Sequence, residues 1–484
     1  MDQRRGGGTD HTRGSQRASP RLRIVLYNPR AVFYTMPLAL VALASALDRT
    51  RFEVVIVDGR LESDPIKKVI DATDGALCLG ITVLTGAPIR DALAVARAVK
   101  RHRPHCAIIW GGWHPSLFAE ECVAESVVDA AVVGQGEDTF REVVERIAFA
   151  QSIAGCPGTV VRGVTTAPAR PLRDLNELPR HDYSLIPVER YFALKQKRQI
   201  DYISSQGCRF RCAFCADPAV YSRGWTGLAP ERIADEIAAL QTDYSIEEIA
   251  FQDETFFTHP SRIDSLADEF FRREVKVAWT ATLRADQACR MGDALFTKAV
   301  RAGLRRVMIG VESGSQETLD RLKKDLRLDQ VMTAAEMCVR HDVAAIFNFI
   351  VGFPDESDES VDSTLALAKR LRRIHPAFET PIFYYRPYPG NPIADRAKEA
   401  GYQFPRGLEE WADFDYVGGR GPWISAHRWR EVERFKFYTR HVWQDALWRW
   451  PLGAAARWRC DRDWYAFPVE KALVEFIRPP QQVS

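Results

Sequence analysis

Three cysteines in one short loop are spaced to bind an iron–sulfur cluster. Cys208, Cys212 and Cys215 have the spacing C-x3-C-x2-C, and no fourth cysteine follows nearby. A 4Fe-4S cluster normally takes four thiolates, so three thiolates leave one iron without a protein ligand. An open coordination position allows a metal centre to act on a bound molecule. The alternatives are a zinc site with a distant fourth ligand, or reduced thiols in the core.

The loop resembles the signature of the radical S-adenosylmethionine (SAM) enzymes, including the aromatic Phe214 before the third cysteine. In that family, the amino and carboxylate groups of SAM bind the open iron. One electron from the cluster then cleaves SAM and yields a 5′-deoxyadenosyl radical. The resemblance implies that Cys208, Cys212 and Cys215 bind a 4Fe-4S cluster and that SAM is a cofactor.

A run of strands and helices over residues 199–400 must position this loop. Strands are expected at 199–205, 248–253, 275–283, 305–312, 343–352 and 379–386, with helices at 230–240, 262–272, 293–302, 316–324 and 360–372. Six βα units cannot close an eight-stranded barrel, so they predict a partial (β/α)6 barrel with one open side. Functional groups in such barrels lie at the carboxyl ends of the strands.

Acidic residues follow two of these strands. Asp253 and Glu254 end the second strand, and Glu312 ends the fourth. The resemblance implies that Asp253 and Glu254 receive the ammonium group of SAM, which needs an anionic partner where water is excluded. It also implies that Glu312 faces the ribose or the methionine part of SAM.

Three further residues at the strand ends complete the predicted SAM site. Arg284, after the third strand, is able to clamp a carboxylate through two hydrogen bonds. Ser313 belongs to the same predicted site, although its spacing to Gln316 is also typical of a helix capping box. Gly352 lets the backbone approach the adenine. No residue is assigned as a catalytic acid or base.

An α/β domain precedes the barrel. Expected strands at 22–28, 53–58, 75–82, 106–111 and 129–134 alternate with helical patterns such as 37–47 and 88–101. Strands separated by single helices predict a parallel sheet covered on both faces. The result is a Rossmann-like domain whose ligand lies beyond the carboxyl ends of the strands.

The strand ends of this domain resemble those of the cobalamin-binding domain that precedes many radical SAM domains. The residues concerned are Thr82, Gly111, Gly112, His114, Gly134, Gly136 and Glu137. The resemblance implies that they line a groove for cobalamin and its nucleotide tail. The D-x-H-x-x-G motif is absent, so no histidine is expected below the cobalt, and Gln135 replaces the more usual glutamate. The alternative is a vestigial domain that no longer binds cobalamin.

The composition bears on the partners and the cellular compartment of the chain. The chain has 484 residues and a net charge of +2, which gives no general attraction to nucleic acid or anionic membranes. Ten cysteines without a signal peptide indicate a reducing compartment, taken as the cytoplasm. The sequence has no stretch of 18 apolar residues, so no transmembrane helix is expected.

The predicted division of the chain has five parts. They are a disordered tail at 1–20, the cobalamin-binding domain at 21–150, a linker at 151–198, the partial barrel at 199–400 and a helical cap at 401–484. The linker is rich in Pro, Gly and Arg, and its stretch Leu175-Asn-Glu-Leu-Pro-Arg-His-Asp182-Tyr resembles the link before the cluster domain in these proteins.

Tryptophan is concentrated in the C-terminal region. Eight of the twelve tryptophans follow residue 405: Trp411, Trp423, Trp429, Trp443, Trp448, Trp450, Trp458 and Trp464. We expect a helical cap that closes the open side of the barrel and builds an aromatic pocket wall. Contact with a membrane interface and stacking on nucleic acid are the alternatives.

The sequence thus resembles a cobalamin-dependent radical SAM enzyme, and we expect it to methylate carbon. The implied partners are a small-molecule or peptide natural-product substrate and a reducing protein such as flavodoxin or ferredoxin, without nucleic acid. An oxidative cyclase or rearrangement enzyme is the main alternative. Two other classes are an enzyme of the transfer-RNA methylthiolation type and a zinc-stabilised binding protein without catalytic activity.

Overall fold

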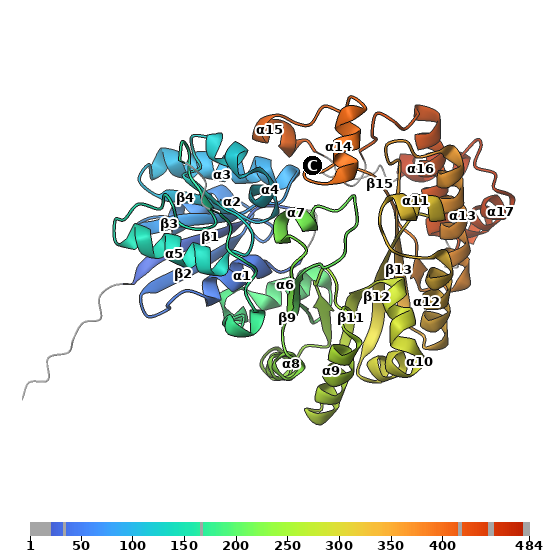
Figure 1. The fold of residues 1–484 in the computed structure, drawn as a ribbon, viewed down its shortest axis with the longest axis horizontal. Helices are drawn as coiled ribbons and strands as arrows, with labels where there is room; N and C mark the ends of the chain where they lie inside the picture. Colours follow the sequence, from blue (N-terminus) through green and yellow to red (C-terminus); the bar gives the residue numbers. More distant parts are fainter. Residues whose placement is uncertain (1–20, 32–34, 165–167, 415–418, 444–449, 478–484) are drawn as a thin grey trace, which may run out of the picture.

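The structure, a computed structural model, describes residues 21–31, 35–164, 168–414, 419–443 and 450–477. The tail predicted at 1–20 lies outside the described residues, as does Trp448. Figure 1 shows two α/β units side by side, with C-terminal helices placed along the top and the right-hand side.

The first unit is built on a six-stranded sheet with the order β2-β1-β3-β4-β5-β6. Its strands are β1 (Leu22–Asn28), β2 (Phe52–Asp58), β3 (Ala76–Thr82), β4 (Ala107–Gly111), β5 (Ala130–Val132) and β6 (Thr159–Val160). The first five are parallel, and β6 pairs antiparallel with β5. The strand order reverses between β1 and β3, which is where open α/β sheets bind ligands.

Helices cover both faces of this sheet. They are α1 (Leu38–Ser45), α2 (Pro65–Ala72), α3 (Ala87–His102), α4 (Trp113–Ala124) and α5 (Glu137–Ala148). Successive side chains of a strand point to opposite faces. Ile24 and Leu26 accordingly pack with α1 and α5, whereas Val25 and Tyr27 pack with α3 and α4. All four residues are fully buried, which explains the continuous apolar run in the sequence.

The second unit is a parallel sheet with the order β14-β13-β12-β11-β10-β7. Its strands are β7 (Gln199–Tyr202), β10 (Glu248–Phe251), β11 (Ala278–Leu283), β12 (Leu304–Glu312), β13 (Ala344–Val351) and β14 (Phe378–Glu379), with β15 (Ile382–Tyr384) also paired to β13. Among the described residues, β7 and β14 do not pair with each other, so the barrel is open. The prediction of a Rossmann-like domain followed by a partial barrel is confirmed.

Helices of the linker and of the barrel follow the strands. They are η1 (Leu175–Glu177), η2 (Tyr183–Leu185), α6 (Val188–Lys195), α7 (Asp217–Tyr221), α8 (Pro230–Tyr244), α9 (Pro260–Arg272), α10 (Ala285–Arg301), α11 (Gln316–Arg321), α12 (Leu328–Arg340) and α13 (Asp358–Ile374). In β13, Ala345, Phe347, Phe349 and Val351 are buried while the residues between them are half-buried. This alternation leaves one face of the sheet turned to the barrel interior.

The C-terminal helices contact both units. They are α14 (Pro392–Glu399), α15 (Gly407–Ala412), α16 (Ala426–His441), α17 (Trp450–Arg462) and α18 (Val469–Ile477). Of these helices, α16 packs against α13 of the barrel. Unexpectedly, α15 packs on α3 and α4 of the first unit. Trp411 is buried there, and its indole N–H donates to Glu121 at 3.0 Å. The C-terminal region therefore bridges the two units.

No described helix has both the length and the apolar character that a membrane crossing requires.

Candidate functional site

The cysteine loop is carried by a short antiparallel hairpin, β8 (Ser205–Gly207) and β9 (Trp225–Gly227). Cys208 directly follows β8. The backbone N–H of Cys215 donates to the carbonyl of Cys212 at 3.2 Å, and the N–H of Asp217 donates to the Cys215 sulfur at 3.4 Å. All three thiols are free and half-buried. These two hydrogen bonds hold the loop as a tight turn after the hairpin strand β8.

These thiols fit a cluster better than a single ion. Among the described residues, no three His, Cys, Asp or Glu side chains converge on one point that could hold a metal ion. Zinc requires such convergence, with Zn–S distances of about 2.3 Å, whereas the thiolates of a cluster bind different irons. Burial raises the pKa of Cys208 to about 11 and that of Cys215 to about 12. Both are therefore thiols at neutral pH unless a cation displaces the proton.

Arg284 lies against the cysteine loop. Its guanidinium is 3.8 Å from the centre of the Phe210 ring, and its Nη1 lies 3.9 Å from the Cys212 sulfur. Its other donors are used, because Nε bonds Asp286 at 2.9 Å and Nη2 bonds the carbonyl of Lys324 at 2.6 Å. The expected clamp on a SAM carboxylate would have to replace these contacts. As it stands, Arg284 holds the loop to the barrel.

The two acidic residues after β10 occupy different environments. Asp253 is buried and accepts the N–H of Ser204 at 2.8 Å, the Ser204 hydroxyl at 2.6 Å and the Ser205 hydroxyl at 2.5 Å. Its acceptor capacity is used inside the protein. Glu254 instead lines a cleft between the two units. Burial in the cleft, together with the nearby carboxylates of Asp217 and Asp253, raises the pKa of Glu254 to about 8. Of the two, Glu254 is the one whose side chain lines the cleft.

Glu312 has a strained backbone and a buried partner. Its φ is +71°, and the pairing of β12 with β13 is irregular between Gly310 and Glu312. Left-handed backbone at a residue other than glycine costs about 1–3 kcal/mol and is concentrated at functional sites. The Lys324 ammonium donates to Glu312 Oε1 at 2.5 Å, and both side chains are more than nine-tenths buried. Nothing in the sequence pattern indicates Lys324, because it lies in the turn after α11.

The serine that caps α11 is not the predicted one. Ser315 accepts the N–H of Thr318, so the capping box expected between Ser313 and Gln316 is wrong. Ser313 is fully buried, and its hydroxyl accepts the N–H of Ser315 at 3.1 Å and bonds the Thr364 hydroxyl at 3.2 Å. The structure thus places Ser313 in the contact between this turn and α13.

Gly352 is covered by the C-terminal region. Its φ is +74°, and a Cβ atom there would lie 2.0 Å from Cδ1 of Ile424. Its carbonyl accepts the indole N–H of Trp423 at 2.5 Å, and its N–H donates to Glu356 at 2.5 Å. Ile424 and Trp423 of the C-terminal region therefore lie against Gly352, and the expected approach to the adenine stays a prediction.

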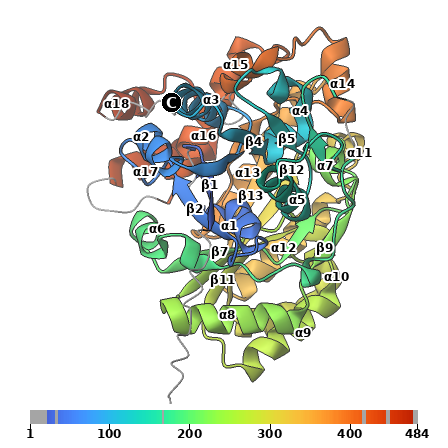
Figure 2. The same cartoon turned by 90° about the vertical axis from the view of Figure 1, so that its left-hand side faces the viewer.

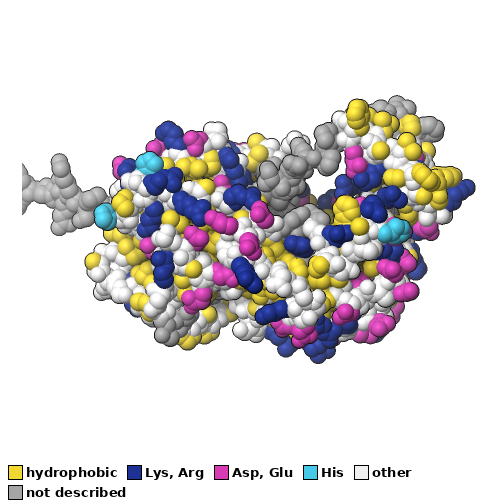
Figure 3. Space-filling view, turned by 90° about the horizontal axis from the view of Figure 1, so that it is seen from above, with side chains coloured by type: hydrophobic (Ala, Val, Ile, Leu, Met, Phe, Trp, Pro, Cys, Tyr) yellow, Lys and Arg dark blue, Asp and Glu magenta, His cyan; other side chains and the backbone are white. Residues whose placement is uncertain are grey.

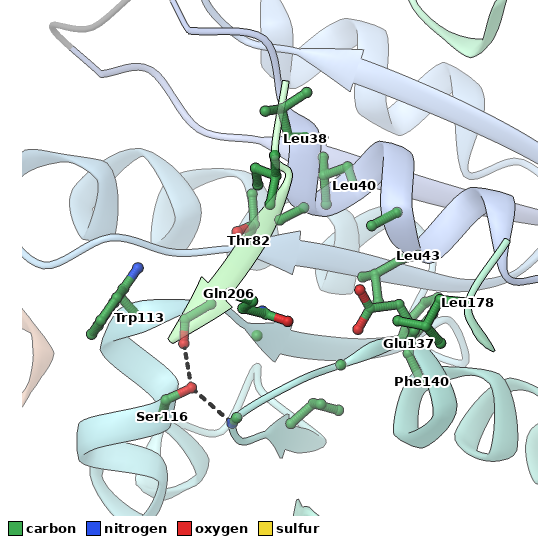
Figure 4. A pocket seen from close by; sticks show the side chains of 18 of the residues that line it. Leu38, Leu40, Leu43, Thr82, Trp113, Ser116, Glu137, Phe140, Leu178 and Gln206 are labelled. Atoms are coloured by element: carbon green, nitrogen blue, oxygen red, sulfur yellow. Dashed lines mark hydrogen bonds between the residues drawn. The ribbon is translucent and has the colours of Figure 1, made fainter. Parts of the chain in front are cut away.

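The cleft lies between the strand ends of the first unit and the hairpin of the second, and it contains about 1580 Å³ of empty space, counting the part open to solvent. Of the predicted cobalamin residues, Thr82, Gly111, Gly112, Gly134, Gly136 and Glu137 line it (Figure 4). Ser116 joins two of these turns, because its hydroxyl donates to the Gly112 carbonyl at 2.7 Å and accepts the Gly134 N–H at 3.0 Å. A Cβ at Gly134 would meet nothing within 4 Å. The glycines thus leave room for a bulky ligand.

His114 does not line the cleft. It is completely buried between Phe118 and Trp411, at ring distances of 4.8 Å and 5.9 Å, and its Nδ1 lies 3.2 Å from the Thr85 hydroxyl. Burial lowers the pKa of His114 to about 3. The histidine that does line the cleft is His181, from the linker.

A chain of polar contacts joins the two units across the cleft. Gln135 is buried, and its side-chain amide donates to Gln206 of the hairpin at 2.9 Å and accepts the backbone N–H of Arg173 at 2.8 Å. Gln206 in turn donates to the Tyr221 hydroxyl at 3.1 Å, and the Tyr221 ring packs edge-on against Trp113 at 6.0 Å. Gln135 therefore couples the first unit to the element that carries the cysteines, a role the sequence does not indicate.

Comparison with known proteins identifies the family. The model of the Radical SAM superfamily matches residues 202–368, and that of the B12 binding domain matches residues 25–144. The uncharacterised methyltransferase PH0819 of Pyrococcus horikoshii is 30% identical over 75% of this chain and 78% of its own length. The chain belongs to the radical SAM superfamily and carries a B12-binding domain.

Two further proteins place this radical SAM enzyme among its relatives. The anaerobic magnesium-protoporphyrin IX monomethyl ester cyclase of Rubrivivax gelatinosus is 23% identical over 66% of this chain, which spans 59% of that relative. The radical SAM methyltransferase TsrM of Kitasatospora setae, solved with cobalamin and a 4Fe-4S cluster, has a TM-score of 0.69 and 14% identity, over 92% of this chain and all of that one. The likeness to TsrM concerns the fold.

Proposed function

We propose that this radical SAM enzyme transfers a methyl group to a carbon atom of a small-molecule or peptide substrate, using a 4Fe-4S cluster, SAM and cobalamin. The observation that carries the proposal is the shared cleft. The glycine-ended strands of the B12-binding domain line one side of it, and Glu254 and the cysteine hairpin line the other. When bound, the cluster and SAM supply a carbon-centred radical, and cobalamin supplies the methyl group. The radical and the methyl group must meet at the same substrate carbon, which explains why both domains face one cleft.

The residues of the chain have distinct parts in this proposal. Cys208, Cys212 and Cys215 hold the cluster, and Arg284 fixes their loop to the barrel. Glu254 accepts hydrogen bonds from the SAM amino group, in place of Asp253, whose two oxygens already accept three hydrogen bonds. Glu312, held by Lys324, lies at the end of β12 and contacts the ribose or the methionine part. Thr82 and the glycine turns at Gly111, Gly112, Gly134 and Gly136, with Glu137, hold the corrinoid. No side chain is needed as an acid or base.

The proposal includes a reducing partner of the flavodoxin or ferredoxin type and a cytoplasmic location. Ten cysteines without a disulfide among the described residues support a reducing compartment.

Cyclisation or oxidation is the second candidate function, because a cyclase is among the relatives. It uses the same radical step without transfer of a methyl group.

A labelling experiment separates the two. Extracts of cells that lack the gene provide the substrate, and anaerobically reconstituted protein receives methyl-deuterated SAM and a reductant. Methyl transfer predicts a metabolite three mass units heavier than its unlabelled counterpart, together with S-adenosylhomocysteine and 5′-deoxyadenosine. A product without the label, and 5′-deoxyadenosine as the sole coproduct, refutes methyl transfer and supports the second candidate. The variant with alanine at Cys208, Cys212 and Cys215 must give neither product.

A further inference from the structure

The last helix of the chain turns an apolar face to solvent. Val469, Leu473, Phe476 and Ile477 in α18 lie at positions i, i+4, i+7 and i+8, which form one side of a helix. Their exposed fractions are 69%, 59%, 86% and 67%, and that of Phe467, just before the helix, is 78%. We call these five residues the α18 face. Globular proteins normally bury such a stripe.

The helix is held in this orientation by polar contacts on another side. Glu470 accepts the Tyr438 hydroxyl at 2.8 Å and pairs with Arg459 at 2.8 Å. Arg459 is buried in α17 and also donates to the carbonyls of Ala466 at 2.7 Å and Phe467 at 2.9 Å. The polar side of α18 therefore faces the protein, and its apolar side is left outside.

Aromatic and cationic side chains flank the α18 face. Trp458 and Trp464 are 44% and 40% exposed and meet edge-on at 5.4 Å, and the Arg462 guanidinium lies 5.0 Å from the Trp458 ring. Residues 420–484 contain twelve Lys or Arg and seven Asp or Glu, although the whole chain is nearly neutral. Figure 3 shows hydrophobic side chains gathered with Lys and Arg at the right-hand end of the molecule, and Figure 2 shows α18 at its outer edge.

The size of the face argues against a second copy as its occupant. Nine residues of helix extend about 14 Å, so the ridge covers a few hundred Å², whereas a stable interface needs about 800 Å² per partner. A lipid interface has no such size requirement, because each inserted large apolar side chain contributes about 1.5–3 kcal/mol by itself.

We infer that the α18 face docks on the surface of an anionic lipid bilayer. Phe467, Phe476 and the aliphatic side chains enter the boundary between head groups and acyl chains, Trp458 and Trp464 lie at head-group depth, and the surrounding cations meet lipid phosphates. This contact is peripheral, and it does not depend on the proposed methyl transfer.

Vesicle sedimentation of the full-length protein tests this inference. The protein should sediment with vesicles of phosphatidylglycerol and phosphatidylcholine, more weakly with phosphatidylcholine alone, and less at high salt. The double variant Leu473→Asp/Phe476→Asp should lower the partition coefficient at least tenfold. Both side chains are more than half exposed, so the variant should keep the thermal midpoint of the parent.

The matched control is Phe149→Asp, which changes a side chain of similar exposure, 63%, on the first domain and should bind vesicles like the parent. The inference is overturned if the parent does not sediment with anionic vesicles, or if the double variant sediments equally well. A lipid-free dimer that the double variant abolishes would identify a second copy as the occupant instead. Retention of a protein partner with no vesicle binding would likewise overturn the lipid assignment.

Discussion

Replacement of Lys324 by methionine should destabilise the barrel strongly, because it leaves the Glu312 carboxylate buried without its cation. The two charged groups are 2.5 Å apart, and less than a tenth of each side chain is exposed. Removal of one partner of a buried pair costs about 3–5 kcal/mol. At about 2–4 °C per kcal/mol for a domain of this size, the thermal midpoint should fall by about 6 to 20 °C.

Thermal unfolding of the cluster-free full-length protein measures this effect, with the double variant Glu312→Gln/Lys324→Met as the decisive comparison. In the double variant, an uncharged pair of similar volume replaces the isolated charge, so most of the lost stability should return. The coupling energy of the double-mutant cycle should therefore exceed about 2 kcal/mol. Additive losses in the cycle, or a Lys324→Met protein as stable as its parent, would show that the two charges do not depend on each other. The surface pair of Lys67 and Asp71 is the control, and Lys67→Met should shift the midpoint by less than about 2 °C.

Three further predictions concern the cleft and its cover. Because the pKa of Glu254 is raised to about 8, this group holds a proton at pH 7, and in the cluster-free protein binding of the SAM ammonium lowers its pKa and releases that proton. Calorimetry in buffers of different ionisation enthalpy should therefore show proton release at pH 7, little above pH 9 and none in Glu254→Gln. Gly111→Leu should lower corrinoid retention at least tenfold without loss of iron. Gly111→Ala should lower it much less, because a Cβ atom at this position would lie 3.8 Å from its nearest neighbour. Equal retention by both variants would show that this strand end does not belong to the corrinoid site. Gly112 is a poor choice for this test, since its φ of +97° strains any side chain. Trp411→Ala should lower the local stability of the α15–α4 contact by about 3–5 kcal/mol. Amide hydrogen exchange should then become faster in α15 and α4 but not in α12. An equal change in all three helices would show that α15 is not docked on α4.

The sequence predicts those features that arise from local pattern. Continuous apolar runs between helical patterns lead to two parallel sheets, because each buried strand needs both faces covered. The cysteine spacing is equally local. Glycine turns at Gly111 and Gly134 follow from their place at strand ends, and both line the cleft.

Partnerships between distant residues could not be predicted in this way. Asp253 and Glu254 are adjacent, and only the positions of Ser204 and Ser205 show which carboxylate is already saturated. Lys324 reaches Glu312 through a turn with no regular pattern. His114 stands in a motif-like turn, but the burial of its ring depends on Trp411, which is almost three hundred residues away in the chain.

The position of the C-terminal region has a mechanical consequence for the cleft. Trp411 is anchored on the B12-binding domain and Trp423 on Gly352 of the barrel, so eleven intervening residues connect the two walls. A connection of this length spans at most about 40 Å when fully extended, which limits how far the domains separate without the loss of one anchor. Trp411 combines a buried ring with an indole hydrogen bond, and Trp423 combines a half-buried ring with one. Release of a bulky corrinoid therefore requires either a domain motion within this limit or the detachment of one tryptophan. Trp423, which lies over the barrel mouth, is the more exposed of the two.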